Sequence, residues 1–208
     1  MPKSYDPAGG SFALTGAYAD AAPFWNTATL LRDGTVLVTG FNYSGDFGGA
    51  AEIFDPKNGT FSPTGPITNG ADENTATPLL NGTVLFVGNE ENDGFPGDAE
   101  IYDPTAGTFT FIGFTHAPHE FSAAARLRDG TVLIVGGQLP GGNGSRGADL
   151  YVPATGTFDV AGNMVTGRHS TTATLLPDGT VLIAGGYSTW PNPTPSAEIY
   201  SPHSAPPQ

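Results

Sequence analysis

One recurring position in this sequence holds residues that can bind a metal ion or exchange protons. Aligned on its four Gly-Thr dipeptides, the chain places Phe24, Asp72, Glu120 and His169 at this position. Carboxylate oxygens and imidazole nitrogens bind divalent metals, and they also act as general acids and bases. Asp72, Glu120 and His169 are therefore a candidate metal or acid–base site, with a polar lining as the alternative. No cofactor is expected beyond a possible divalent metal.

The residues around this position extend the candidate site. His116 and His119 precede Glu120 in the segment HAPHE, which adds imidazoles to the set. The helical H-E-x-x-H spacing of zinc proteases is absent, however, and Pro118 favours an extended loop. Asn89 to Gly94 carries alternating oxygen ligands but lacks the distal glutamate of a calcium loop, so it is interpreted as a solvated acidic loop.

Aromatic residues in the same connections suggest a second kind of chemistry. Exposed aromatic rings stack on sugars or anchor protein contacts, whereas buried rings only fill the interfaces between sheets. Both interpretations stay open for these rings. The combined candidate ligand-binding residues are Phe24, Trp25, Asn26, Tyr43, Asp72, Glu73, Asn74, His119, Glu120, Phe121, Arg168, His169 and Trp190.

A fourfold repeat must position these residues. The dipeptides Gly34-Thr35, Gly82-Thr83, Gly130-Thr131 and Gly179-Thr180 lie 48, 48 and 49 residues apart. Each lies between two apolar stretches, as in LLPDGTVLIAGG, and Asp-Gly or Asn-Gly supplies the positive φ of a tight hairpin turn. Each repeat thus opens with a β-hairpin.

The second half of each repeat predicts two more strands. AEIFDPKNGTF, AEIYDPTAGTF, ADLYVPATGTF and AEIYSP contain a third strand and a turn, and the first three continue into a fourth strand at Thr-Phe. Four-stranded antiparallel units that repeat in this way form the blades of a β-propeller. The hairpin turns and the Pro-containing turns then share one face, and the long connections share the other. The long connections are the candidate binding face, since loops on a rigid scaffold carry function.

The repeat resembles a known family. HSTTATLLPDGTVLIAGG followed by AEIYSP is similar to the kelch repeat, in the bacterial form related to the galactose oxidase propeller domain. The double glycine of that repeat is present at Gly136-Gly137 and Gly185-Gly186, but the first two copies have Thr39-Gly40 and Gly88-Asn89. The resemblance implies an all-β propeller of four four-stranded kelch-like blades. Galactose oxidase relatives use copper with a cysteine-crosslinked tyrosine, and the absence of cysteine excludes that cofactor in its usual form.

The two ends of the chain suggest how the ring closes. Tyr5-Asp6-Pro7 matches Tyr200-Ser201-Pro202, and the last copy stops after its third strand. We predict that the N-terminal strand at Ser11 to Gly16 completes the last blade, so that residues 1–208 form one domain and a monomer. Two alternatives remain: the four blades are a fragment of a larger propeller, or two chains join into one ring.

Composition limits the partners. The net charge is −13, so DNA and anionic membranes would be repelled. The N-terminus MPKSYDPAGG lacks an apolar signal segment, and no apolar run is long enough to span a bilayer, so we expect a soluble protein. The absence of cysteine fits a cytoplasmic protein as well as a secreted bacterial one.

These features support three functional hypotheses. The first is a noncatalytic recognition module that binds a glycan or a protein segment through the long-loop face. The second is a metal-assisted or acid–base enzyme that uses Asp72, Glu120 and His169. The third is a scaffold, or a fragment of a larger propeller, without a site of its own.

Overall fold

The computed structural model describes residues 3–19, 24–42, 48–68, 75–88 and 95–202; for residues 3, 24–26, 41–42 and 48 it describes the backbone alone. Within these ranges every regular element is a β-strand, and the strands form six antiparallel sheets. The predicted all-β class is therefore confirmed. The described chain has no helix, and so none that is long and apolar enough to cross a bilayer.

Three sheets have the four-stranded form predicted from the repeat. The first contains β3 (Phe24–Leu30), β4 (Val36–Asn42), β5 (Gly48–Asp55) and β6 (Thr60–Pro63). The second contains β7 (Thr75–Pro78), β8 (Val84–Gly88), β9 (Asp98–Asp103) and β10 (Thr108–Phe114). The third contains β11 (Ala123–Arg126), β12 (Val132–Val135), β15 (Gly147–Val152) and β16 (Thr157–Asn163). In each sheet the strands lie in chain order, because each pairs with the next within its repeat.

The other three sheets are smaller or differently placed. The fourth repeat forms a three-stranded sheet of β17 (Thr172–Leu175), β18 (Val181–Ala184) and β21 (Ala197–Tyr200). At the N-terminus, β1 (Lys3–Asp6) pairs with β2 (Ser11–Leu14) in a two-stranded sheet. The long connections of the third and fourth repeats form a sheet of β13 (Gln138–Leu139), β14 (Asn143–Gly144), β19 (Tyr187–Thr189) and β20 (Asn192–Pro193).

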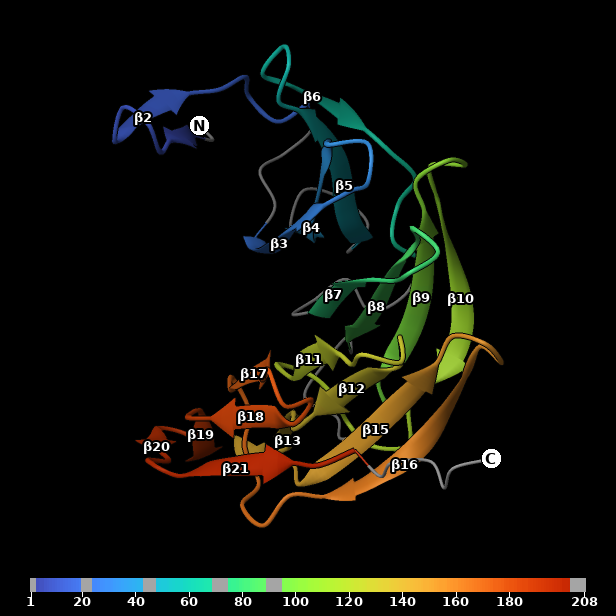
Figure 1. Cartoon of the computed structure of the whole chain (residues 1–208), viewed down its shortest axis with the longest axis vertical. Coiled ribbons are helices and arrows are strands. Elements are labelled where there is room, and N and C mark those ends of the chain that lie inside the picture. The colour runs from blue at the N-terminus through green and yellow to red at the C-terminus, as the bar shows by residue number, and fades with distance from the viewer. Residues whose placement is uncertain (1–2, 20–23, 43–47, 69–74, 89–94, 203–208) are drawn as a thin grey trace.

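The sheets follow one another along an open arc (Figure 1). The first strands of the repeats lie on its inner side, where β3 contacts β7, β7 contacts β11, and β11 contacts β17. The fourth strands β6, β10 and β16 lie on the outer side. Residues just before β11 and β17 are therefore brought close together at the inner side of the arc.

The same turn chemistry closes every hairpin between first and second strands. Thr35 donates from its backbone N–H and its hydroxyl to Asp33 Oδ1, at 2.9 and 2.7 Å, and Gly34 has φ 88°. The other three repeats make the same pair of hydrogen bonds, which join Asn81 to Thr83, Asp129 to Thr131 and Asp178 to Thr180. This Asx-Gly-Thr turn fixes the strand register, as the sequence predicts.

The second strands form the core because their side chains are buried on both faces. On β8, Val84 and Phe86 pack in a cluster with Leu37 of the first sheet, whereas Leu85 and Val87 pack in a cluster with residues of the third. Successive side chains of a strand point to opposite faces, so a continuous apolar run is what a strand between two neighbouring sheets requires.

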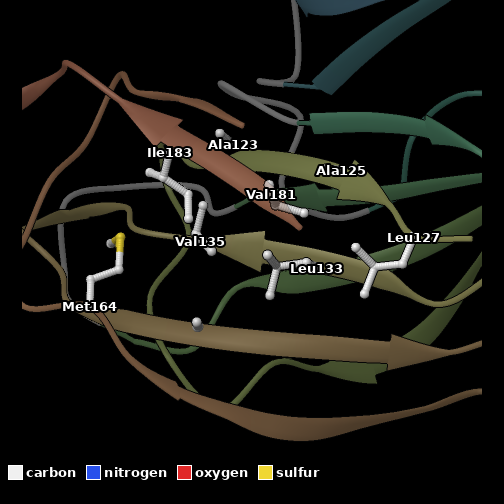
Figure 2. Close-up of a cluster of buried hydrophobic side chains, with 9 residues drawn as sticks. Ala123, Ala125, Leu127, Leu133, Val135, Met164, Val181 and Ile183 are labelled. Atoms are coloured by element: carbon white, nitrogen blue, oxygen red, sulfur yellow. The ribbon is translucent and has the colours of Figure 1, made fainter. Parts of the chain in front are cut away.

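The same arrangement continues into the fourth repeat (Figure 2). Leu133 and Val135 of β12 pack with Val181 and Ile183 of β18, and Met164 closes the cluster. Each of these side chains is buried. Because a fully buried aliphatic side chain contributes about 1.5–3 kcal/mol, these clusters hold successive sheets together.

The predicted ring closure was wrong. β2 pairs with β1, not with β21, and the sheet of the fourth repeat has three strands among the described residues. β1 is itself a third strand of the repeat and is joined to β2 by a short turn, with Tyr5 opposite Phe12. Pairing across this short loop costs less chain entropy than pairing with β21 near the other end of the chain.

Candidate functional site

The two kinds of connection lie on opposite faces, as predicted from the repeat. Hairpin turns and Pro-containing turns line shared hollows. One hollow is lined by Arg32 and Gly82, from two successive hairpin turns, and by Pro104 of a Pro-containing turn. A second hollow of this kind joins Gly130 to Pro153. The long connections of the third and fourth repeats line a different pocket, which is the candidate site.

This pocket has a volume of about 510 Å³ and lies where the third and fourth repeats meet. Two pairs of residues come from the segments just before β11 and β17, and the rest come from the loops after β12 and β18. The lining residues are Glu120, Phe121, Gln138, Gly141, Gly142, His169, Ser170 and Trp190. Four of the candidate ligand-binding residues thus share one hollow: Glu120, Phe121, His169 and Trp190.

Backbone hydrogen bonds within the third repeat and between the third and fourth repeats hold the pocket together. The N–H of Gln138 donates to the carbonyl of Glu120 at 2.7 Å, and the N–H of Ser170 donates to the carbonyl of Phe121 at 2.8 Å. The N–H of Trp190 donates to the carbonyl of Gly142 at 2.8 Å. The pocket walls are therefore fixed by the backbone rather than by side chains alone.

Two residues of the pocket have an unusual backbone conformation. Phe121 and Ser170 occupy equivalent positions in their repeats, and both have φ of 51°. Residues other than glycine adopt this left-handed conformation at a cost of about 1–2 kcal/mol. Such strain is concentrated at functional sites, where the surrounding structure enforces it.

A row of rings runs through the site. The imidazole of His169 stacks on the ring of Tyr187, with centroids 5.5 Å apart and planes inclined by 24°. The ring centroid of Phe121 lies 6.2 Å from that of His169. Tyr187 also contacts Trp190 at 4.8 Å. Trp190 is 61% exposed, whereas His169 is only 2% exposed. The row therefore leads from a buried imidazole to an exposed indole.

The buried imidazole is neutral at neutral pH. Burial lowers the pKa of His169, and the nearby Gly142 carbonyl opposes this only partly. Ser170 Oγ lies 3.1 Å from His169 Nδ1, so the hydroxyl can donate to the neutral ring. His169 Nε2 is buried and has no hydrogen-bond partner among the described residues.

His119 and Arg168, two further candidate ligand-binding residues, face the protein interior and do not line the pocket. Both are fully buried. His119 Nε2 lies 2.8 Å from Asp149 Oδ2, and Arg168 donates from Nη2 to Glu198 Oε1 at 2.8 Å. Arg168 also donates to the carbonyls of Gly185 and Ser196. Both side chains stabilise the structure behind the site.

The acids that these side chains contact belong to a repeating set that sequence analysis missed. Glu52, Glu100, Asp149 and Glu198 occupy equivalent positions on the third strands. Each carboxylate accepts hydrogen bonds from backbone N–H groups in the connection that enters its own repeat; the donors are Ala19, Thr68, His116 with Ala117, and Val165 with Thr166. The recurring A-E-I-Y and A-D-L-Y segments were the signal that could have revealed them.

Asp149 has the most elaborate surroundings of the four. Burial raises the pKa of this carboxyl, but hydrogen bonds from His119, Ala117 and His116, together with the charge of His119, outweigh burial and hold the pKa below its usual value. His116 Nδ1 lies 2.9 Å from Asp149 Oδ1. The segment HAPHE is therefore tied to a structural carboxylate, and no three histidine, aspartate or glutamate side chains among the described residues are placed to hold a metal.

The remaining candidate residues cannot be located in the site. Tyr43, Asp72, Glu73 and Asn74 lie outside the described residues, and for Phe24, Trp25 and Asn26 only the backbone is described, at the start of β3. Of the proposed Asp72, Glu120 and His169 set, the structure brings Glu120 and His169 into one pocket. Gln138 and Gly142 are pocket residues outside the candidate set; only a three-dimensional view places their loop against Trp190.

Comparison with known proteins adds no family to this description. No model of a known protein family matches the chain, and no curated protein matches it either. Its function is therefore inferred from its own residues.

Proposed function

We propose that this chain is a noncatalytic recognition module, built from kelch-type propeller blades, that binds its ligand in the pocket between the third and fourth repeats. One observation carries this proposal: the exposed ring of Trp190 lines the same hollow as the buried carboxylate of Glu120 and the amide of Gln138. Ligand sites combine aromatic walls with a few polar groups in this way.

The kelch-type assignment is supported by the repeat and by its packing. Successive four-stranded sheets, with the apolar second strands β8 and β12 each packed between two neighbouring sheets, are what propeller blades require. The double glycines fit the same assignment, because a Cβ on Gly137 would overlap the Pro118 carbonyl and a Cβ on Gly186 would overlap the His169 carbonyl. In both cases glycine allows the loop after the second strand to approach the connection that enters the same repeat.

The same pocket supports an acid–base enzyme less well than it supports a ligand-binding site. Ser170 and His169 form a hydroxyl–imidazole contact, but no acid among the described residues orients this imidazole, because its Nε2 has no partner there. A nucleophilic serine needs a base that a third group positions. Burial also lowers the pKa of His169, which weakens it as a base.

Binding to arrays would test the proposal. Labelled protein is applied to a printed glycan array and to a peptide array, beside the variants Trp190→Ala and Phe12→Ala. Phe12 is an exposed aromatic residue on β2, outside the pocket, and is therefore the matched control. We expect a retained ligand whose binding is lost in Trp190→Ala and kept in Phe12→Ala. Equal binding by both variants would contradict the pocket assignment.

A further inference from the structure

Trp190 is a fixed aromatic platform at the mouth of the pocket. Its side chain is 61% exposed, yet its backbone N–H bonds to Gly142 and its ring contacts Tyr187 at 4.8 Å. A Cβ on Gly142 would lie 3.1 Å from the Cβ of Trp190, so glycine lets the loop approach the indole closely. An exposed ring held in this way offers its face to a ligand at little cost in ordering.

The polar lining favours hydroxyl groups over anionic groups. Glu120 is 6% exposed, and its carboxylate can accept hydrogen bonds from ligand hydroxyls, while the Gln138 amide can both donate and accept. Among the described lining residues, Glu120 is the one acidic side chain and none is lysine or arginine, while burial lowers the pKa of His169. With a net charge of −13 on the chain, an anionic ligand would be repelled.

The size of the hollow favours a compact ligand over a length of polypeptide. A volume of about 510 Å³, lined by eight residues, lies within the range of small-molecule sites. Extended peptides instead use an open strand edge or a long groove. The neighbouring strands β13, β14, β19 and β20 pair with one another around this site.

We infer that this pocket takes a neutral saccharide, whose pyranose ring stacks on Trp190 and whose hydroxyl groups bond to Glu120 and Gln138. This inference rests on the recognition function proposed above. The ring face of a pyranose is a patch of C–H groups that suits an indole, and its hydroxyls match a carboxylate beside an amide. Tyr187 packs against the Trp190 ring, and His169 stacks on Tyr187.

Calorimetric titration with defined probes tests the inference. The probes are the methyl glycosides of glucose, galactose, mannose and N-acetylglucosamine, with glucuronic acid as the anionic probe and an arginine-rich peptide as the cationic one. We expect saturable binding of at least one neutral glycoside and none of glucuronic acid. Trp190→Ala and Glu120→Gln should each weaken that binding about tenfold, which is the loss of about 1.4 kcal/mol.

Two further variants are controls for this titration. Trp190→Phe retains a smaller ring and should restore part of the affinity, whereas Phe12→Ala should bind as the unaltered protein does. Circular dichroism checks that each variant is folded. Because Trp190 is largely exposed, its replacement should leave the fold intact.

The other outcomes separate the saccharide inference from the recognition function. If the arginine-rich peptide binds in a Trp190-dependent manner and no glycoside saturates, the saccharide assignment is overturned while the recognition function stands. If glucuronic acid binds as tightly as the neutral glycosides, the preference for a neutral ring is overturned. If none of the probes binds and the arrays are also blank, both proposals fail.

Discussion

His119 and Asp149 form a fully buried pair, with Nε2 and Oδ2 2.8 Å apart. His119 Nδ1 lies 2.6 Å from the Gly136 carbonyl, which can only accept a hydrogen bond. The pKa of Asp149 is held low, so its carboxylate also accepts. Both ring nitrogens of His119 therefore face hydrogen-bond acceptors. One repeat later, Arg168 and Glu198 make the equivalent contact with a permanent cation.

Removal of His119 should strongly destabilise the protein. In His119→Ala, Asp149 keeps its backbone hydrogen bonds but loses its buried imidazole partner, and breaking such a buried pair costs about 3 kcal/mol. Urea unfolding of the variant beside the unaltered protein measures this loss.

His116→Ala is the matched control for this experiment. His116 also contacts Asp149, but its side chain is 50% exposed, so its loss should cost less than about 1 kcal/mol. Similar losses in the two variants would show that burial of the His119 pair is not what stabilises the third repeat. His119→Gln, which keeps one donor, should fall between them.

His169 should make stability depend on pH in the neutral range. Burial lowers the pKa of His169 in the folded state, whereas in the unfolded chain it titrates near 6.5. The unfolded state therefore binds the proton first as the pH falls, so the free energy of unfolding should decline from about pH 7 through 6.5 and below. His169→Gln cannot titrate, and urea unfolding from pH 7 to 5 should give it a shallower slope. A slope equal to that of the unaltered protein would refute this assignment.

The parts of the structure that local chemistry determines were predictable from the sequence. The Asx-Gly-Thr turns set the hairpins, and the repeat register placed Glu120 and His169 in one pocket. Ring closure was not predictable, because β2 can pair with either β1 or β21, and only the balance of loop entropy and packing decides between them.

Side-chain direction was the second feature that the sequence did not reveal. His119 and Arg168 directly precede Glu120 and His169 in the sequence, and nothing in the sequence favours one member of each pair over the other as a ligand-binding residue. Neighbouring residues of an extended chain point in opposite directions, so the first of each pair faces the carboxylate of a third strand. The partners of these carboxylates are largely backbone N–H groups, which leave no mark in the sequence.

The left-handed backbone at Ser170 should make this position sensitive to side-chain shape. Ser170 has φ 51°, which glycine adopts without strain and which a β-branched residue resists. Ser170→Val should therefore be less stable than Ser170→Gly by about 1–2 kcal/mol in urea unfolding. At the exposed Ser201, whose φ is not positive, the valine variant should not be less stable than the glycine variant. If it is, the left-handed backbone does not explain the stability difference at Ser170.

The double glycine at Gly185 and Gly186 should separate backbone strain from steric overlap. Both residues have positive φ, of 68° and 86°, so alanine at either position is strained by about 1 kcal/mol. A Cβ on Gly185 meets no atom within 4 Å, but a Cβ on Gly186 would overlap the His169 carbonyl. That carbonyl also accepts the Tyr187 N–H at 3.0 Å, so overlap there pushes apart the rings of His169 and Tyr187 beside Trp190.

Gly186→Ala should thus lose at least about 2 kcal/mol more than Gly185→Ala in urea unfolding. It should also alter Trp190 fluorescence in a Trp25→Phe background, which Gly185→Ala should leave unchanged. Equal losses from the two variants would mean that the close approach of the Gly186 backbone to the His169 carbonyl does not require glycine.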